Sequence, residues 1–143
     1  MRGKRALMLL MFLALVGLCS CGGGDNEDTG ATVNATGTYQ GSWASAVVDN
    51  AGALTATFTQ NGDRLVGQMV FGQSPCFVLG VFDADINGNR LDGELRLDSG
   101  DDAEITGEIV HNGGTINGTY RVDGGRCDTD RGSFSLVRLP PTS

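Results

Sequence analysis

A five-residue pattern with glycine at its centre recurs along the chain and constrains what the chain can fold into. It occurs at YQGSW (39–43), LVGQM (65–69), LDGEL (91–95), ITGEI (105–109) and INGTY (116–120). In each copy, one apolar residue lies two places before the glycine and another lies two places after it. Because alternate residues of a strand point to the same side, each copy predicts a strand with a glycine in the middle of its apolar face.

Three Asn-Gly pairs between such runs predict β-hairpins, because Asn-Gly is the strongest short hairpin signal. The pairs are Asn61-Gly62, Asn87-Gly88 and Asn112-Gly113. With Asn-Gly as a two-residue turn, the innermost apolar cross-strand partners are Phe58 with Leu65, Ala84 with Leu91, and Ile109 with Ile116. All three pairs are apolar, and a one-residue slip would set apolar residues against polar ones.

The remaining links complete an all-β meander. A loop at 99–101 would set Leu97 against Ala103, and a loop at 72–75 would set Phe71 against Cys76. The eight predicted strands are 37–43, 53–60, 64–71, 76–86, 89–98, 102–111, 114–122 and 132–139. Their opposite faces are polar, which favours a water-exposed outer wall. We expect an eight-stranded antiparallel meander closing as an up-and-down barrel, with a two-sheet β-sandwich as the alternative.

Small residues at equivalent inward positions would form a ring in this barrel. The ring residues are Gly41, Ala56, Gly67, Gly80, Gly93, Gly107 and Gly118. Glycine kinks let strongly coiled strands close, so the ring is interpreted first as a device for curvature. The alternative is the wall of a cavity, since an eight-stranded barrel can also hold one small ligand.

The first 20 residues predict a targeting segment. MRGKR is basic, and the apolar stretch at 6–18 is too short to span a bilayer comfortably. The next residues, Leu18-Cys19-Ser20-Cys21, resemble the lipobox of bacterial lipoproteins, with Leu at −3, a small residue at −1 and Cys at +1. The resemblance implies cleavage before Cys21 and a diacylglyceryl thioether on its sulfur. An ordinary secretory signal is the alternative.

Cleavage at this point would leave a strongly acidic chain. Residues 21–143 keep all 17 acidic residues but only seven of the ten basic ones, all arginine, which gives a net charge of −10. Nucleic acid is therefore not an expected partner, because phosphate binding needs clustered Lys and Arg. We expect a lipidated Cys and a flexible acidic tether at 21–35, and the barrel domain at 36–143. Gly22 in place of Asp, by resemblance to enterobacterial lipoproteins, indicates an outer-membrane location in the cell envelope.

Strand direction sorts the loops into two ends of the barrel. The Asn-Gly turns lie at the tether end, whereas Cys76 and Cys127 both lie at the far end, which predicts a disulfide in an oxidising compartment. The far end also carries an acidic rim: Asp49, Asp98, Asp101, Asp102, Asp123, Asp128 and Asp130. Aspartate suits turns; the alternative is a docking surface for a cationic partner. Lipoprotein-type lysozyme inhibitors are similar in class, as small disulfide-bearing barrels that bind a basic enzyme.

One stretch fits a calcium-loop pattern. In DADINGNRLDGE (83–94), the residues Asp83, Asp85, Asn87 and Glu94 occupy the ligand positions of an EF-hand loop. The flanks, however, alternate as strands do, and a hairpin at Asn87-Gly88 would carry Glu94 away from the turn. The hairpin and the calcium loop exclude each other, and we expect the hairpin and no metal.

Residues at both ends of the domain resemble lipocalins and avidins. Those families begin the first strand with Gly-x-Trp and place an Arg on the last strand beneath that ring. Here the first strand gives Gly37-Thr38-Tyr39 and Gly41-Ser42-Trp43, and the last gives Arg138. The resemblance implies a small up-and-down barrel whose floor is closed by a cation–π pair of Tyr39 and Arg138. It implies no particular ligand.

The first expected function is a non-enzymatic binding module for a small apolar ligand. Its ligand-contacting residues would be Trp43, Gly67, Gly93, Gly107, Gly118 and Tyr120. The alternative is a protein-interaction or inhibitor module that binds a cationic partner through the acidic rim. An enzyme comes third, because no nucleophile–base–acid set, phosphate loop or metal cluster occurs in the sequence, and no cofactor beyond the diacylglyceryl anchor is expected. A carrier would need an internal void, whereas an interaction module would have a filled barrel.

Overall fold

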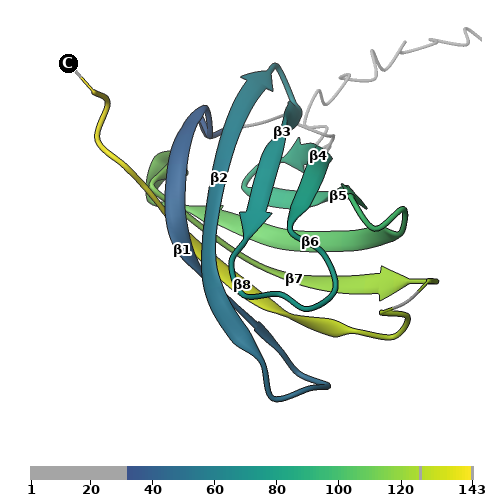
Figure 1. The fold of residues 1–143 in the computed structure, drawn as a ribbon. Helices are drawn as coiled ribbons and strands as arrows, with labels where there is room; N and C mark the ends of the chain where they lie inside the picture. The colour runs from purple at the N-terminus through teal and green to yellow at the C-terminus, as the bar shows by residue number, and fades with distance from the viewer. Residues whose placement is uncertain (1–31, 126, 143) are drawn as a thin grey trace, which may run out of the picture.

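The computed structural model describes residues 32–125 and 127–142, and these form one closed antiparallel barrel. Each strand pairs with its neighbours in the chain, and β8 pairs with β1 to close the ring (Figure 1). The predicted meander barrel is confirmed, and the two-sheet sandwich is excluded because no open edge separates two sheets. No helix within the described ranges is long and apolar enough to cross a membrane.

The strands lie close to their predicted positions. They are β1 (Gly37–Ser45), β2 (Ala51–Asn61), β3 (Arg64–Phe71), β4 (Leu79–Asn87), β5 (Arg90–Leu97), β6 (Asp102–Val110), β7 (Thr115–Asp123) and β8 (Arg131–Arg138), with a 3-10 turn, η1 (His111–Gly113), before β7. The largest error is the start of β4, which begins at Leu79 rather than at residue 76. The Asp98 carboxylate accepts hydrogen bonds from the backbone N–H groups of Val78 and Leu79, at 3.0 and 3.2 Å, and holds the preceding residues in a loop.

Strand registers are only partly as predicted. Around the third Asn-Gly pair, Ile109 lies opposite Ile116 as expected. At the other two hairpins the partners are displaced by two residues, so Phe58 faces Gly67 rather than Leu65, and Ala84 faces Gly93 rather than Leu91. The two loops show the same displacement, with Leu95 opposite Ala103 and Val70 opposite Leu79.

The cause of the displacement lies in the turns. In the β2–β3 and β4–β5 hairpins the two turn residues are Gly62-Asp63 and Gly88-Asn89, and both glycines have φ of +63°. Glycine thus takes the first central position, as in a type II′ turn, and Asn ends the strand instead of starting the turn. A two-residue displacement keeps every side chain on its predicted face, because the side-chain period of a strand is two.

Inward glycines allow side chains of flanking strands to meet over them. Gly67 lies between Phe58 on β2 and Phe82 on β4, and the two rings approach to 4.9 Å between centroids. A Cβ built on Gly67 would lie 1.9 Å from the Thr57 carbonyl oxygen. The position therefore has no room for any side chain. This supports the interpretation of the ring of small residues as a device for strand curvature.

The interior is filled with apolar side chains from all eight strands. One aromatic cluster lies toward the tether end, where Tyr39 packs on Phe58 at 5.5 Å. Another lies at the far end, where Phe71 contacts Phe77 at 4.9 Å and Tyr120 at 6.5 Å between ring centroids. Among the described residues, no polar or charged residue is fully buried in this core.

Arg138 closes the base of the barrel. Its guanidinium lies 5.6 Å from the centroid of the Tyr39 ring, so the predicted cation–π pair is confirmed. The Tyr39 hydroxyl accepts hydrogen bonds from Arg138 Nε and Nη2, at 3.2 and 3.1 Å, and donates one to the Gly113 carbonyl at 2.6 Å. Arg138 also donates to the Asn34 carbonyl, which ties the chain before β1 to the base.

Residues 32–35 belong to the barrel, four residues before the predicted domain boundary at 36. Ala35 is completely buried, and Val33 packs against the core. Gln60 holds both residues, because its side chain accepts a hydrogen bond from the Ala35 N–H at 2.7 Å and donates one to the Val33 carbonyl at 2.9 Å. The predicted tether at 21–35 otherwise lies outside the described residues, as do Cys21 and the signal segment.

A disulfide clamps the far end, as predicted. Cys76 and Cys127 are bonded, with their Cα atoms 5.9 Å apart and a sequence separation of 51 residues. By restricting the unfolded chain, a loop of this length stabilises the fold by about 3–4 kcal/mol.

We predict that Gly93→Ala destabilises the barrel by about 2 kcal/mol or more, as expected for overpacking against atoms that cannot move aside. The added Cβ would lie 2.3 Å from the Asp83 carbonyl oxygen and 2.4 Å from the Ala84 Cα, which are backbone atoms of β4. Urea unfolding followed by circular dichroism measures the change. Gly72→Ala is the control, since Gly72 lies in the loop after β3 and its added Cβ would come no nearer than 3.2 Å to the Ala53 carbonyl oxygen, so the loss should be much smaller. Equal stability of Gly93→Ala and the parent protein would contradict the proposed role of the glycine.

Candidate functional site

Three depressions on the outside of the barrel wall each lie over one or two inward-facing glycines of the strands. Gly67 and Gly93 underlie one depression, Gly107 and Gly118 a second, and Gly132 a third. At each of these glycines the strand has no side chain on its inner face, and its backbone coils inward. Solvent therefore reaches the glycine backbones from outside, and all five glycines are half-buried.

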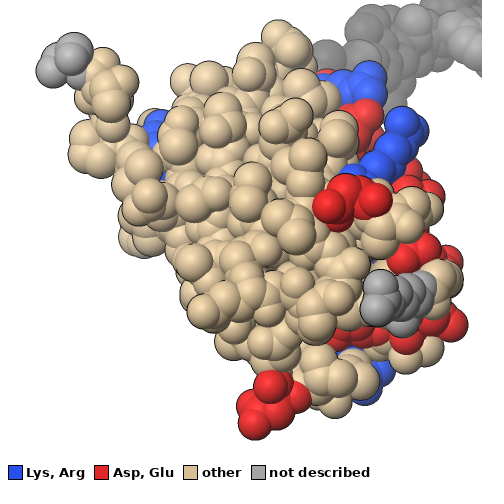
Figure 2. Space-filling model, viewed as in Figure 1, with Lys and Arg blue, Asp and Glu red and all other residues tan. Residues whose placement is uncertain are grey.

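Charged side chains gather on one side of the molecule. Figure 2 shows them over β4, β5 and their neighbours, while the broad face over β1 and β2 carries almost none. Neither β1 nor β2 contains an acidic or basic residue. All acidic and basic residues within the strands therefore lie on β3 to β8.

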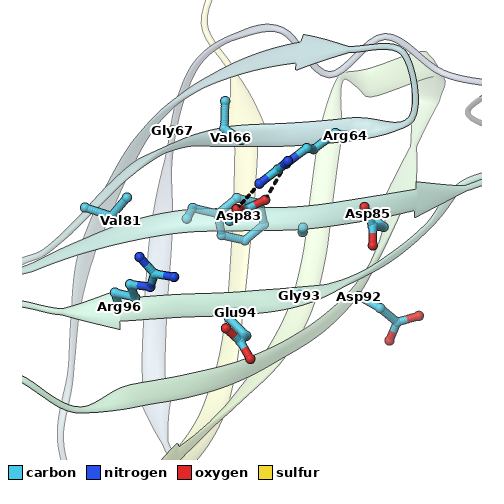
Figure 3. A pocket seen from close by; sticks show the side chains of 12 residues that line it. Arg64, Val66, Gly67, Val81, Asp83, Asp85, Asp92, Gly93, Glu94 and Arg96 are labelled. Carbon is cyan, nitrogen blue, oxygen red and sulfur yellow. Dashed lines mark hydrogen bonds and ion pairs between the residues drawn. The ribbon is translucent and has the colours of Figure 1, made fainter.

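The depression over Gly67 and Gly93, here called the acidic groove, has a volume of about 550 Å³. Its outward-pointing lining residues are Arg64, Val66, Val81, Asp83, Asp85, Asp92, Glu94 and Arg96, contributed by β3, β4 and β5 (Figure 3). In this view Asp83 and Glu94 lie in the middle, Arg64 lies above Asp83 and Arg96 to the left, and Asp85 and Asp92 lie to the right.

Carboxylates face carboxylates across this wall. Asp83 lies directly opposite Glu94, and Asp85 lies directly opposite Asp92. Glu94 in turn lies opposite Glu104 on β6. Like charges directly opposite each other on adjacent strands are destabilising, so this arrangement costs the isolated barrel stability. A cationic group bound between these strands would relieve the repulsion.

Arg64 neutralises one of these acids. Its Nε donates a hydrogen bond of 2.8 Å to Asp83 Oδ1, and its Nη2 contacts Asp83 Oδ2. The hydrogen bond to Arg64, followed by the charge of its guanidinium, lowers the pKa of Asp83 below the usual value of an aspartate. Arg90 pairs with Asp92, at 3.2 Å. Within residues 32–125 and 127–142, Asp85, Glu94 and Glu104 have no ion-pair partner.

Exposed valines border the acidic groove. Val81 lines it and is 50% exposed, and Val70 and Val78 nearby are 42% and 55% exposed. Val70 lies directly opposite Leu79 on β4, two residues along that strand from Val81. An exposed apolar patch beside polar residues is typical of protein-interaction surfaces.

The calcium-loop alternative is wrong for this segment. Residues 83–94 form the β4–β5 hairpin, and Asp83, Asp85 and Asn87 lie on its outer face at alternate positions of one strand. Asn87 pairs with Arg90 beside the turn, whereas Glu94 lies up the strand opposite Asp83. In the described part of the chain, no three His, Cys, Asp or Glu side chains are placed to hold a metal ion.

The predicted ligand-contacting aromatic residues lie together but are buried in packing. Trp43 and Tyr120 are 2% and 3% exposed, and both pack against Phe71. Trp43 donates its Nε1–H to the Gly72 carbonyl at 3.0 Å. The predicted glycines are Gly67, Gly93, Gly107 and Gly118. Their backbones lie so close to adjacent strands that an added Cβ would meet atoms of those strands.

Tyr120 is held at the rim by polar partners. Its hydroxyl lies 3.4 Å from Asp130 Oδ2, and Asp130 Oδ1 accepts a hydrogen bond of 2.6 Å from the Ser45 hydroxyl. Burial, followed by the nearby Asp130 charge, raises the pKa of Tyr120 far above its usual value. Tyr120 therefore stays protonated at neutral pH and is a structural hydrogen-bond donor.

Sequence reasoning missed Phe77 altogether. The predicted strand from residue 76 pointed Phe77 outward and Val78 inward, but Phe77 is 3% exposed and Val78 is 55% exposed. The loop before β4 breaks the alternation and turns Phe77 over the far end of the core, against Phe71 and Tyr120. Only the Ser74 and Asp98 side chains, which bind the backbone of this loop, hint at it in the sequence.

Several carboxylates of the predicted acidic rim serve local structure. Asp98 binds the backbone of the β3–β4 loop, and Asp128 accepts a hydrogen bond of 2.9 Å from the Gly124 N–H. Asp130 binds Ser45 and Tyr120. The turn interpretation is correct for these three residues. Asp85, Glu94 and Glu104, which have no ion-pair partner in the described part of the chain, lie on the wall in and beside the acidic groove.

Comparison with known proteins assigns no family. No protein-family model matches the chain, and no curated protein sequence matches it at a significant level. The function is therefore inferred from the residues and their arrangement.

We predict that Arg64→Gln raises the pKa of Asp83, because it removes the hydrogen bond and the positive charge that lower it. Since the folded-state pKa is depressed, the Arg64–Asp83 pair stabilises the fold above the usual aspartate pKa of about 3.9. That stabilisation is lost as the pH falls through the folded-state pKa. A carboxyl NMR titration measures the shift, and Arg90→Gln is the matched control that should leave Asp83 unchanged. An unaltered Asp83 titration in Arg64→Gln would show that the ion pair does not form in solution.

Proposed function

We propose that this protein is a lipid-anchored, non-enzymatic interaction module of the bacterial cell envelope that docks a cationic partner in the acidic groove. The observation that carries the proposal is the row of facing carboxylates Asp83, Glu94 and Glu104 beside the exposed Val81. The partner is expected to present Lys or Arg side chains next to apolar ones.

The combination of charge and apolar surface supports a protein partner over a free ion. Protein interfaces combine apolar contact area with polar and charged contacts. Val66 and Val81 at the edge of the groove supply apolar area, and the carboxylates supply charge complementarity, which speeds association and selects the partner. A closed barrel offers no strand edge, so the partner must bind through side chains rather than by adding a strand.

The filled interior gives less support to carriage of a small apolar ligand. Trp43 and Tyr120 would have to move out of their contacts with Phe71 before a ligand could reach them. The predicted ring glycines do not widen the interior, since a Cβ there would meet a neighbouring strand or the side chains packed over it. An interaction module requires no such rearrangement.

The anchor completes the proposal. The signal features before Cys21 support lipidation at that residue, and the backbone N–H of Thr32 donates to the Gly88 carbonyl at the base of the barrel. The chain thus enters at the end with the β2–β3, β4–β5 and β6–β7 turns. The base then faces the membrane, and the disulfide end faces away from it.

The docking proposal predicts binding of a labelled octapeptide of alternating Lys and Val, measured by fluorescence polarisation with the purified full chain. Binding should weaken as salt rises from about 20 mM to about 300 mM, because surface attraction is screened. The double variant Asp85→Asn, Glu94→Gln should bind at least about tenfold more weakly, because it removes the two lining carboxylates that have no ion-pair partner within residues 32–125 and 127–142.

The matched control for this experiment is Asp49→Asn, Asp123→Asn, which removes the same charge from exposed positions at the far end, outside the groove lining. An octapeptide of alternating Glu and Val should not bind. Absence of Lys-Val binding at low salt, or equal weakening by both double variants, would contradict the docking proposal. Neither result would bear on the proposed lipidation of Cys21.

For the anchor, we predict that Cys21→Ser moves the protein from the membrane fraction to the soluble fraction and removes the mass of a diacylglyceryl group. Cys19→Ser is the control and should leave both unchanged, because Cys19 lies at −2 of the lipobox. Mass spectrometry of the protein from a bacterial host reports the modification. Membrane association of Cys21→Ser equal to that of the parent would refute lipidation at Cys21.

A further inference from the structure

Two arginines face each other on the β7–β8 part of the wall, which β6 separates from the acidic groove. Arg121 on β7 lies directly opposite Arg131 on β8, and both side chains are exposed. Like charges in this position repel, as the carboxylates do. Within residues 32–125 and 127–142, neither guanidinium has a carboxylate oxygen within 4 Å, although Glu104 lies across from Arg121 on β6. The pair is therefore a place where a bound anion would remove a repulsion.

The arginine pair opens onto a depression of about 480 Å³ whose lining also includes Glu104, apolar groups and three hydroxyl side chains. Thr106, Thr119 and Ser133 supply the hydroxyls, and the depression lies over Gly132 and the Tyr120 ring. A second depression, of about 590 Å³ over Gly107 and Gly118, shares Thr106 and Thr119 with the first. The two depressions adjoin on the outer wall and together are here called the hydroxyl trough; the lining of the second also includes Arg90 and Glu108.

Polar side chains continue along the hydroxyl trough away from the arginines. The Thr106 and Thr119 hydroxyls are hydrogen-bonded to each other at 2.9 Å. Farther along, the Ser135 hydroxyl donates to Asn117 Oδ1 at 2.7 Å, and Asn89 donates to Glu108 at 2.9 Å. Hydroxyl and amide groups both donate and accept, so this row suits a ligand that carries many hydroxyls.

We propose that the hydroxyl trough binds an acidic saccharide. Its carboxylate lies between Arg121 and Arg131, because a guanidinium matches the geometry of a carboxylate through two parallel hydrogen bonds. The neighbouring sugar units lie along Thr119 and Asn117, whose side chains bond their hydroxyls. The site is separate from the acidic groove and does not depend on the docking function proposed above.

The net charge of the protein limits the affinity but does not prevent binding. Residues 21–143 carry a charge of −10, which repels anions at long range. At physiological ionic strength, interactions between exposed charges are largely screened beyond about 8 Å. We therefore expect weak binding that is strongest at intermediate salt, where the distant acids are screened and the contacts to the arginines persist.

The test is a titration of the purified full chain with tetragalacturonate, followed by amide chemical shifts in NMR. The amides of Thr119, Arg121 and Ser133 should shift, and the neutral tetramer of galactose should leave them unchanged. Arg131→Gln should weaken binding at least about tenfold. Arg96→Gln is the matched control, because Arg96 is an exposed strand arginine outside the trough and should bind like the parent.

Inorganic phosphate and the galacturonate monomer distinguish an ion site from a saccharide site. Binding of the tetramer more tightly than either of them supports the proposal. Equal binding of phosphate and the tetramer would mean an adventitious ion only and would overturn it. Equal weakening by Arg131→Gln and Arg96→Gln, or no shift at any salt concentration with the fold intact, would also overturn it.

Discussion

Contact between side chains across a glycine is the interaction on which this barrel depends. At Gly67, two phenylalanines from the flanking strands meet because nothing projects between them. At Gly118, the Phe134 ring fills the same kind of gap, lying 2.5 Å from where a Cβ would be. Glycine weakens a strand by itself, but at these sites the loss is offset by burial of the large side chains that cover it. Because glycine has no side chain, the strands can also coil inward at these positions. The depressions of the outer wall therefore lie over the glycines whose backbones contact neighbouring strands most closely.

The sequence predicted the faces of the strands much better than their alignment. The alternation of apolar and polar residues assigned the buried residues of all eight strands correctly, because a one-residue error would have exposed them to water. A two-residue displacement leaves each face unchanged, so alternation could not detect the errors at Phe58 and Ala84. The alignment of these two hairpins depended on whether Asn or Gly occupies the first turn position. The two turns differ little in free energy, so side-chain contacts next to the turn can decide between them. Phe77 was missed because no periodicity describes a loop that folds over the end of a barrel.

The candidate sites were predictable in kind but not in place. Composition indicated an acidic surface, and the disulfide followed from the position of its cysteines. The facing pairs Asp83–Glu94 and Arg121–Arg131 exist only once adjacent strands are aligned, and the predicted β4–β5 register set Asp83 beside other partners. Several aspartates expected on the rim are occupied by loop backbone, which sequence patterns do not reveal. The uncharged side of the barrel follows from the sequences of β1 and β2, but which charges face each other on the remaining strands depends on register.

The attachment of residues 32–35 to the base has a mechanical consequence for a protein held by its N-terminus. With the anchor proposed at Cys21, any pull between membrane and partner enters the barrel through Thr32 and reaches the strands through Gln60, Gly88 and Arg138. Force is thereby shared among β2, the β4–β5 turn and β8 before it acts along β1. A barrel pulled at β1 alone could lose that strand in a peeling motion, one hydrogen bond at a time, whereas this arrangement requires contacts to several strands to fail together.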